Sequence, residues 1–267
     1  MSKVLWDQHL HTTLSFDGVG EMENMCRRAM ELGLARITFT EHIDYHHPQT
    51  GEDFSVDFDA YRARVEACRE QFPRLSIGYG IEAGITAENA EDTRKAVASQ
   101  PFDCVLASQH VVANADPYFP VFFEGRDRAE AVRLYAEELY HTAKRLPDFD
   151  VMTHIGYVTK FGPYTDQPFG YEDAPDILDE VLKELILSGR SLEVNTSGYL
   201  RCGEPYAAVS ILKRYRQLGG EMITFGSDAH DEAHMAQFFD AGQELVKSLG
   251  FRYCAVYRNR RAEMLPL

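Results

Sequence analysis

The chain has 267 residues, of which 45% are hydrophobic, so it is long enough to bury a large core and falls within the size range of one α/β barrel. Lys and Arg number 27 against 42 Asp and Glu, and the net charge of -15 argues against broad binding to the phosphates of nucleic acids or membranes. Bound cations would offset part of this charge.

The cysteines and the first residues bear on the cellular compartment. The five cysteines form no CxxC pair, so neither a disulfide framework nor a Cys-rich zinc site is expected. The segment Met1 to Asp7 lacks an apolar signal core, and no stretch approaches the roughly 18 uninterrupted apolar residues of a membrane span. We therefore expect a cytoplasmic protein that is neither exported nor embedded in a membrane.

Short apolar runs alternate with longer amphipathic segments along the chain. The length and periodicity of the apolar runs predict β-strands, each followed by a loop and usually by a segment of helical period. In chain order these strands are Val4–His9, Ala35–Thr40, Ser76–Ile81, Cys104–Ser108, Asp150–His154, Ser191–Asn195 and Met222–Gly226, and a last one is expected at Tyr253–Tyr257.

Helical periodicity is clearest in four of the intervening segments. They are Asp57–Gln71, Arg126–Arg145, Glu172–Leu187 and Pro205–Leu218, and Gly189 and Gly219 stand at plausible C-terminal ends. The repeated βα units contain no linker or compositional break, which favours one domain over residues 1–267 with a closed parallel barrel. An open doubly wound sheet is the alternative.

Two histidines stand two residues apart at the end of the first predicted strand, in the sequence Asp7-Gln8-His9-Leu10-His11. Side chains two apart on a strand point to the same face, so His9 and His11 can both bind one metal ion. The pair alone is a modest signal, because surface or hydrogen-bonded histidines give the same pattern.

The pattern continues at the ends of later predicted strands. These ends read Thr40-Glu41-His42, Gly80-Ile81-Glu82, Gln109-His110, Thr153-His154 and Ser227-Asp228-Ala229-His230. The C-terminal ends of parallel barrel strands lie on one face, so these residues are expected to converge. Strand alternation would turn Glu41 and Gln109 away from that face, and we expect them to be structural.

In combination, these motifs and Asp17 are similar to those of the PHP family, the polymerase and histidinol phosphatase superfamily, over essentially the whole chain. The resemblance implies a distorted TIM-like (β/α)7 barrel with up to three metal ions. It implies three ligand groups, namely His9, His11, Glu82 and Asp228; Glu82, His110 and His154, with Glu82 bridging; and Asp17, His42 and His230. Such nitrogen and oxygen donors suit Zn²⁺, Mn²⁺ or Fe²⁺ without deciding among them.

Three loop sequences resemble the free-standing histidinol-phosphate phosphatases of this family more than its polymerase-associated branch. They are Phe122-Phe123-Glu124-Gly125, Phe161-Gly162-Pro163-Tyr164 and Asn195-Thr196-Ser197-Gly198. The resemblance implies hydrolysis of L-histidinol phosphate, with a hydroxide between the first two metal ions attacking phosphorus. The sequence contains no motif of a phospho-enzyme nucleophile.

Basic residues in the loops of an otherwise acidic protein are candidate phosphate partners. We expect Lys160, where relatives often have arginine, and Arg201 to bind the substrate phosphate. His46 lies in the loop after the second predicted strand, and we expect it, with the neighbouring His47 and Tyr45, at the imidazole or amine end of the substrate.

The catalytic candidates are Asp228 and His230. The imidazole of His230 can protonate the leaving alkoxide, although a metal-bound histidine is a poor proton donor, and a water can take that role instead. Asp7, two residues before His9, either orients an imidazole or caps its strand.

Two other functions are compatible with parts of the sequence. A PHP phosphoesterase can act on another small phosphate ester, because family membership determines chemistry better than substrate. A non-catalytic metal-binding domain of the polymerase-accessory kind would be expected to have lost ligands, whereas all nine positions are filled here. We expect a small phosphorylated substrate and no nucleic-acid or membrane partner, and the sequence does not predict the oligomeric state.

Overall fold

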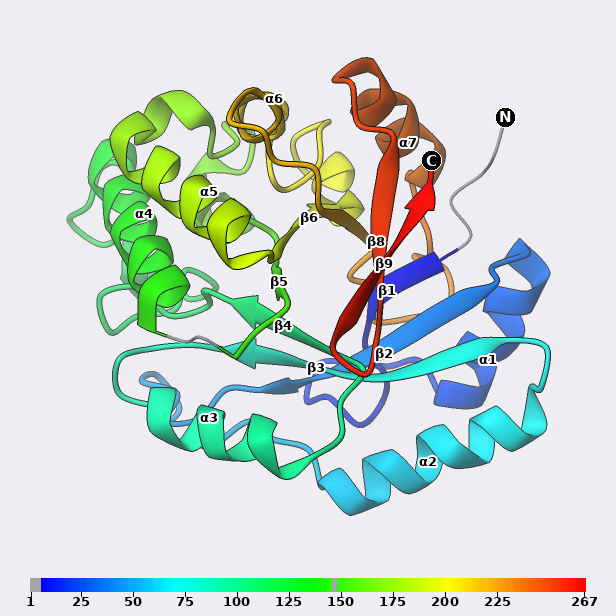
Figure 1. Ribbon diagram of the computed structural model, residues 1–267. Coiled ribbons are helices and arrows are strands. Elements are labelled where there is room, and N and C mark those ends of the chain that lie inside the picture. The colour runs from blue at the N-terminus through cyan, green and yellow to red at the C-terminus, as the bar shows by residue number, and fades with distance from the viewer. Residues whose placement is uncertain (1–5, 146–147) are drawn as a thin grey trace.

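The computed structural model describes residues 6–145 and 148–267, and its centre is a sheet of seven parallel strands in chain order (Figure 1). The strands are β1 (Trp6–Leu10), β2 (Arg36–Ile43), β3 (Ser76–Gly84), β4 (Cys104–Ser108), β5 (Val151–Met152), β6 (Ser191–Asn195) and β7 (Ile223–Gly226). All seven predicted strands are present, although the start of the predicted Val4–His9 strand lies outside the described residues.

The sheet closes on itself between β1 and the segment that follows β7. The backbone N–H of Asp228 donates to the carbonyl of His9 at 3.0 Å, and that of His11 donates to the carbonyl of Ala229 at 2.9 Å. Leu10 and Ala229 form a parallel bridge. The predicted parallel barrel is therefore confirmed, and the open doubly wound alternative is wrong.

Helices surround the barrel and connect its strands (Figure 1). They are α1 (Met22–Leu32), α2 (Phe58–Gln71), α3 (Ala90–Ser99), α4 (Arg128–Arg145), α5 (Pro175–Ser188), α6 (Val209–Gln217) and α7 (Phe239–Ser248). The side chain of Asp57 accepts the N–H groups of Asp59 and Ala60 and so begins α2, while Gly189, with φ 69°, ends α5. The four predicted helices are confirmed, each starting within four residues of its expected position.

The loops after β4, β5 and β6 contain short 3-10 helices. These are η1 (Pro120–Phe123), η2 (Tyr157–Thr159), η3 (Gly162–Tyr164), η4 (Tyr171–Asp173) and η5 (Thr196–Leu200). Two of these elements, η1 and η3, pack together through the rings of Phe123 and Tyr164, whose centroids are 5.7 Å apart. The loops after these three strands therefore contain regular structure of their own.

An antiparallel hairpin of β8 (Tyr253–Arg258) and β9 (Arg261–Pro266) covers the end of the barrel at which the parallel strands begin. The side chain of Gln8 donates to the carbonyl of Ala255 at 2.7 Å and accepts the N–H of Tyr257 at 2.8 Å. The hydroxyl of Tyr257 donates to the carbonyl of Asp150, just before β5, at 3.1 Å. The predicted strand at Tyr253–Tyr257 is confirmed, but it pairs with β9 outside the barrel sheet.

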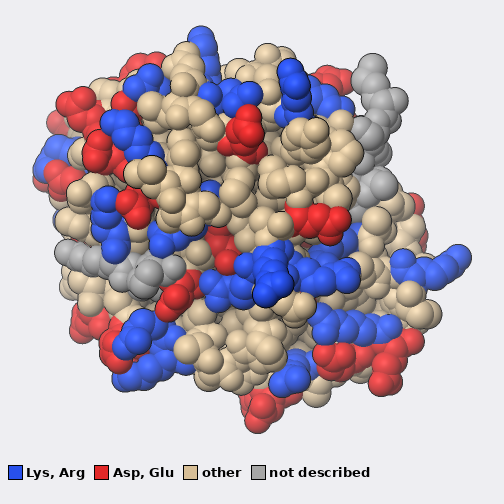
Figure 2. All heavy atoms as spheres, in the orientation of Figure 1, with Lys and Arg blue, Asp and Glu red and all other residues tan. Residues whose placement is uncertain are grey.

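Basic side chains gather in the middle of the face on which this hairpin lies (Figure 2). The hairpin turn contributes Arg258, Arg260 and Arg261, and the guanidinium of Arg260 pairs with the carboxylate of Asp150. Elsewhere on this face acidic and basic side chains alternate (Figure 2). The hairpin therefore contributes to a local group of basic side chains on this face of an acidic protein.

Two expectations about the chain as a whole can be compared with the structure. All five cysteines are unpaired, which confirms the expectation that they form no disulfide framework. Among the described residues, no helix combines the length and the apolar character that crossing a membrane requires.

Candidate metal centre

Glu82 is fully buried near the C-terminal end of β3, and its two carboxylate oxygens face different sets of histidines. Oε2 lies 3.0 Å from Nε2 of His9, 3.2 Å from Nε2 of His11 and 3.3 Å from Nδ1 of His42. Oε1 lies 2.7 Å from Nε2 of His154 and 3.3 Å from Nε2 of His110. Five imidazoles from the ends of four strands, β1, β2, β4 and β5, therefore share one carboxylate.

Asp228 adds a second carboxylate to the His9 and His11 side of this arrangement. Its Oδ1 lies 3.6 Å from Nε2 of each of these two histidines. The backbone of Asp228 has φ 55°, a left-handed conformation that non-glycine residues seldom adopt and that is concentrated at functional sites. The seam that closes the barrel thus also brings this carboxylate over β1.

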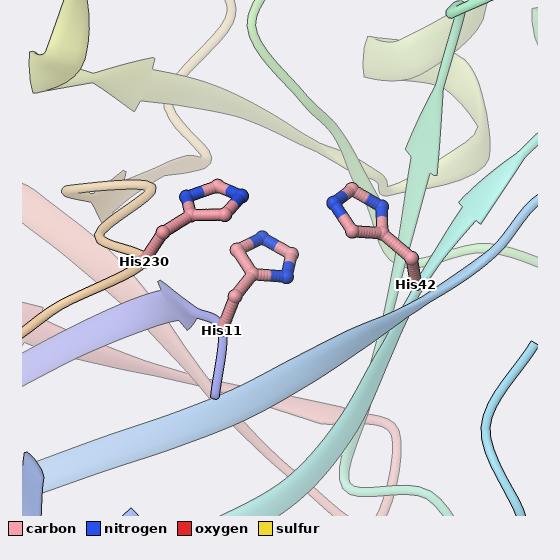
Figure 3. Close-up of side chains that lie close together, drawn as sticks. All are labelled: His11, His42 and His230. Carbon is pink, nitrogen blue, oxygen red and sulfur yellow. The ribbon is translucent and has the colours of Figure 1, made fainter. Parts of the chain in front are cut away.

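A third group of side chains lies beside the first, around His11, His42 and His230 (Figure 3). The ring of His11 is stacked between the other two, with centroid distances of 4.3 Å on both sides. Asp17 completes the group, because its Oδ2 lies 3.1 Å from Nε2 of His230 and its Oδ1 lies 3.6 Å from Nε2 of His42. Both β2 and β3 run three residues further than predicted, which places His42 opposite Glu82 in the parallel ladder.

The structure thus brings together all nine residues that the resemblance implies as ligands. They are His9, His11, Asp17, His42, Glu82, His110, His154, Asp228 and His230. They come from segments more than two hundred positions apart, and the parallel barrel is what unites them.

Mutual attraction between these groups controls their protonation. Burial by itself would raise the pKa of Glu82, but the charges of His9 and His42 outweigh burial and hold that pKa well below its usual range. Burial would lower the pKa of His9, yet Glu193 and Glu82 raise it well above the ordinary value. Burial is outweighed again at His42, where Glu82 and Asp44 raise the pKa to about 9.

His11 behaves differently from these histidines and shows that the site suits a metal ion. Burial, with the charges of His42 and His230, lowers the pKa of His11. Its buried Nε2 has no hydrogen-bond partner of good geometry among the described residues. A neutral imidazole nitrogen aimed at two carboxylates, those of Glu82 and Asp228, is a donor set that binds divalent ions such as Zn²⁺.

Two buried carboxylates that the sequence analysis did not single out lie behind the candidate ligands. Oε1 of Glu193 lies 2.7 Å from Nδ1 of His9, and Oδ1 of Asp44 lies 2.8 Å from Nδ1 of His110. Each carboxylate thereby leaves the opposite ring nitrogen, Nε2, directed at Glu82. A signal existed for Glu193, because it is an acidic residue between Leu192 and Val194 in the middle of a predicted strand.

Three polar residues next to the candidate ligands, Asp7, Glu41 and Gln109, form hydrogen bonds with backbone groups. Asp7 accepts the backbone N–H of Ser227 at 3.0 Å and that of Ala236 at 3.1 Å, so it fixes the loop after β7 and orients no imidazole. Glu41 accepts the N–H of Thr12 at 3.1 Å, and the amide of Gln109 donates to the carbonyl of Val111 at 2.6 Å. These contacts agree with the structural role expected for Glu41 and Gln109.

A cavity of about 630 Å³ opens above the ligand cluster. Its floor includes Glu82 and Asp228, and its walls come from the loops after β2, β4, β5, β6 and β7. Aromatic and apolar side chains stand at its rim, where Phe16 is 60% exposed, Tyr118 58% and Leu200 50%. The cavity can therefore admit a small molecule directly from solvent to the cluster.

Both basic residues expected near the substrate line this cavity. Nζ of Lys160 lies 2.6 Å from Oδ2 of Asp228, and burial, which alone would lower the pKa of this lysine, is outweighed by Asp228, which raises it. Arg201 lies on the loop after β6. The wall of the cavity thus carries positive charge beside the ligand cluster.

The expectation for His46 needs correction, because the structure does not place this residue in the cavity wall. His46 has φ 57°, and its Nε2 lies 3.2 Å from Oδ2 of Asp92, on the outside. The next residue, His47, lines the cavity instead, with its Nε2 3.2 Å from Oδ2 of Asp116. The local backbone turn, which sequence periodicity does not report, thus directs His46 outward and leaves His47 as the histidine of this pair that lines the cavity.

The chain is similar in sequence to proteins of a known family. Residues 7–197 match the PHP domain. The chain belongs to the PHP domain family. It is 27% identical over 259 residues to a histidinol-phosphatase of Lactococcus lactis, and this alignment covers 96% of both chains. It is 29% identical over 227 residues to a probable histidinol-phosphatase of Clostridium acetobutylicum, and that alignment covers 85% of this chain and 87% of the other.

A solved structure supports the same family. The crystal structure of the histidinol phosphate phosphatase from Lactococcus lactis, complexed with zinc, L-histidinol and phosphate, superimposes with a TM-score of 0.91. It is 27% identical and covers 98% of this chain and 100% of that chain. The PHP barrel of the present chain therefore has the same fold over essentially its whole length.

The shared use of Glu82 leads to a first prediction. The variant Glu82→Gln keeps the volume of the side chain but removes the charge that faces five imidazoles, so we expect it to lose bound divalent metal from both sides of the carboxylate. The measurement is metal content by elemental analysis after zinc loading and dialysis. Zinc retained at the level of the parent protein would show that the centre is not built on Glu82.

Protonation of the metal-free cluster leads to a second prediction. Because the pKa of His42 is about 9, this imidazole is protonated at pH 7 and must lose its proton before its lone pair can bind an ion. We expect zinc uptake at pH 7 to release protons, and the apparent affinity to rise with pH until about pH 9. Calorimetric titrations in buffers of different ionisation enthalpy measure this release, and heats independent of the buffer would contradict the prediction.

Proposed function

We propose that this PHP protein is a metal-dependent phosphomonoesterase that hydrolyses L-histidinol phosphate to L-histidinol and phosphate. The observation that carries the proposal is the ligand cluster on the floor of an open cavity, with Lys160 and Arg201 on its wall. The similarity to a histidinol-phosphatase over 96% of the chain supports this choice of substrate.

The cluster would hold two to three divalent ions in the groups described above. Ions bound there would neutralise charge on the phosphoryl oxygens and provide an activated water as the nucleophile. The nitrogen and oxygen donors accept Zn²⁺, Mn²⁺ or Fe²⁺. The zinc in the Lactococcus lactis complex supports zinc as the first ion to test.

The protein's own side chains position the phosphate and the leaving group. The ammonium of Lys160 has two donors beyond the one that faces Asp228, and these can bind a phosphoryl oxygen above that carboxylate. Arg201 would bind from the loop after β6. The side chain of His230 is 26% exposed, whereas the other candidate ligand histidines are at most 8% exposed, so its ring is the one best placed to pass a proton toward the leaving alkoxide.

The organic end of the substrate would lie against the part of the cavity wall that contains Asp116 and His47. There Oδ1 of Asp116 accepts the hydroxyl of Tyr157 at 3.1 Å, while its Oδ2 faces His47. Asp44 adds a second carboxylate to this wall. The negative charge suits the amine of histidinol, and we propose His47, in place of His46, as the histidine near it.

The test of the proposed function is release of inorganic phosphate by the zinc-loaded protein from histidinol phosphate and from a panel of nucleotide and sugar monophosphates. We expect histidinol phosphate to give the highest kcat/KM. If another monoester ranks first, the substrate assignment is wrong while the metal chemistry stands. A protein that loads zinc but releases no phosphate from any ester would contradict the function itself.

The basic wall gives a further prediction for substrate binding. A hydrogen bond to a charged group contributes about 1.5 to 3 kcal/mol, so Lys160→Ala and Arg201→Ala should each raise KM by about 10- to 100-fold. Metal content is measured in parallel, because Lys160 also contacts Asp228. The control is Lys144→Ala, which removes an ammonium that pairs with Glu184 on the outside. Unchanged KM in both cavity variants would exclude these residues from phosphate binding.

A further inference from the structure

We infer that Glu193 is a positioning residue whose single carboxylate sets the geometry on both sides of Glu82, and that Gly226 is required because it leaves the space for it. This inference rests on the metal centre of the proposed function. It concerns a residue that neither the motifs of the sequence nor the ligand groups include.

The contacts of Glu193 reach two ligand-bearing strands. Its side chain is 1% exposed, and Oε1 lies 2.7 Å from Nδ1 of His9 at the end of β1. Oε2 accepts the backbone N–H of His154, after β5, at 2.9 Å, and the side-chain amide of Asn195 at 3.0 Å. His9 faces Oε2 of Glu82 and His154 faces Oε1, so the carboxylate of Glu193 supports one histidine on each side of Glu82.

Gly226, on the neighbouring strand β7, shows that this arrangement leaves no room for a side chain. A Cβ at this position would lie 2.2 Å from Oε1 of Glu193 and 2.5 Å from Cβ of His9. The backbone of Gly226 does not have a positive φ, so the need for glycine here arises from space and not from conformation. The glycine therefore permits the contact between Glu193 and His9.

The same combination occurs on the far side of Glu82, which argues that it is a general feature of this centre. Oδ1 of Asp44 lies 2.8 Å from Nδ1 of His110, and a Cβ at Gly84 would lie 1.7 Å from that oxygen. In both places a buried carboxylate accepts the Nδ1 proton of a candidate ligand, and a glycine at the end of an adjacent strand leaves the space. Such a partner fixes the tautomer and orientation of a metal-binding imidazole.

The decisive variant is Glu193→Gln, because an amide has only one acceptor oxygen. If that oxygen faces His154 and Asn195, the amide N–H groups face Nδ1 of His9 and oppose the tautomer whose Nε2 lone pair is free for a metal ion. If the oxygen faces His9, the amide N–H groups oppose the backbone N–H of His154. Either arrangement disturbs one side of the centre, and loss of an outer partner of this kind weakens metal binding about 10- to 100-fold.

The experiment measures zinc dissociation constants by competition with a chromophoric chelator, together with the visible spectrum of the cobalt-substituted protein and the Tm of each metal-free protein. We expect Glu193→Gln to weaken zinc binding by about 10- to 100-fold and to change the cobalt spectrum. Gly226→Ala keeps the carboxylate but displaces it, and we expect an effect of the same sign. This second variant tests the inference even if Glu193→Gln folds poorly.

The matched control is Asp103→Asn, which alters a buried carboxylate near the hairpin end that accepts the backbone N–H of Tyr79 at 2.9 Å. We expect it to lower Tm while leaving zinc affinity and the cobalt spectrum unchanged. Parent-like zinc affinity and spectrum in Glu193→Gln and Gly226→Ala would overturn the inference. A parent protein that binds zinc but does not hydrolyse histidinol phosphate would contradict the proposed function alone, because the comparison of zinc affinities would still hold.

Discussion

The sharing of the Glu82 carboxylate among five imidazoles is the constraint on which the rest of the site depends. A fully buried carboxylate is costly unless positive charge lies beside it. In the metal-free protein, protonated His9 and His42 supply that charge, and bound divalent ions would replace their protons. Protons and metal ions therefore compete for the same nitrogen atoms, and the charge state of the cluster determines which of them the barrel holds.

The barrel meets this constraint by bringing together donors from the ends of several strands. Parallel strands place their C-terminal ends on one face, and the seam between β1 and the segment after β7 adds Asp228 to that face. Close packing of so many polar side chains then leaves little room at the strand ends. Gly84 and Gly226 lie beside the carboxylates of Asp44 and Glu193, each of which supports an imidazole. A side chain at either glycine would overlap the carboxylate, so the site requires these glycines as well as its ligands.

The candidate ligands can be predicted from sequence because they belong to short motifs at strand ends. A contact between residues far apart in the chain cannot be predicted in this way. His9 and His11 are predictable from spacing along one strand, whereas the contact between His9 and Glu193 joins residues 184 positions apart and exists only once the barrel has closed. The outward position of His46 has a different cause. It follows from one left-handed residue in a loop, which hydrophobic periodicity does not encode.

Lys160 joins the ligand cluster to the cavity above it, and its chemistry explains why a lysine suits this position. Oδ1 of Asp228 faces His9 and His11, while Oδ2 lies 2.6 Å from the ammonium of Lys160. An arginine would engage a carboxylate or a phosphate with a planar fork, whereas an ammonium has three donors that point in different directions. One lysine can thus hold Asp228 and a phosphoryl oxygen at the same time, so that the position of the substrate is tied to that of a carboxylate in the metal centre.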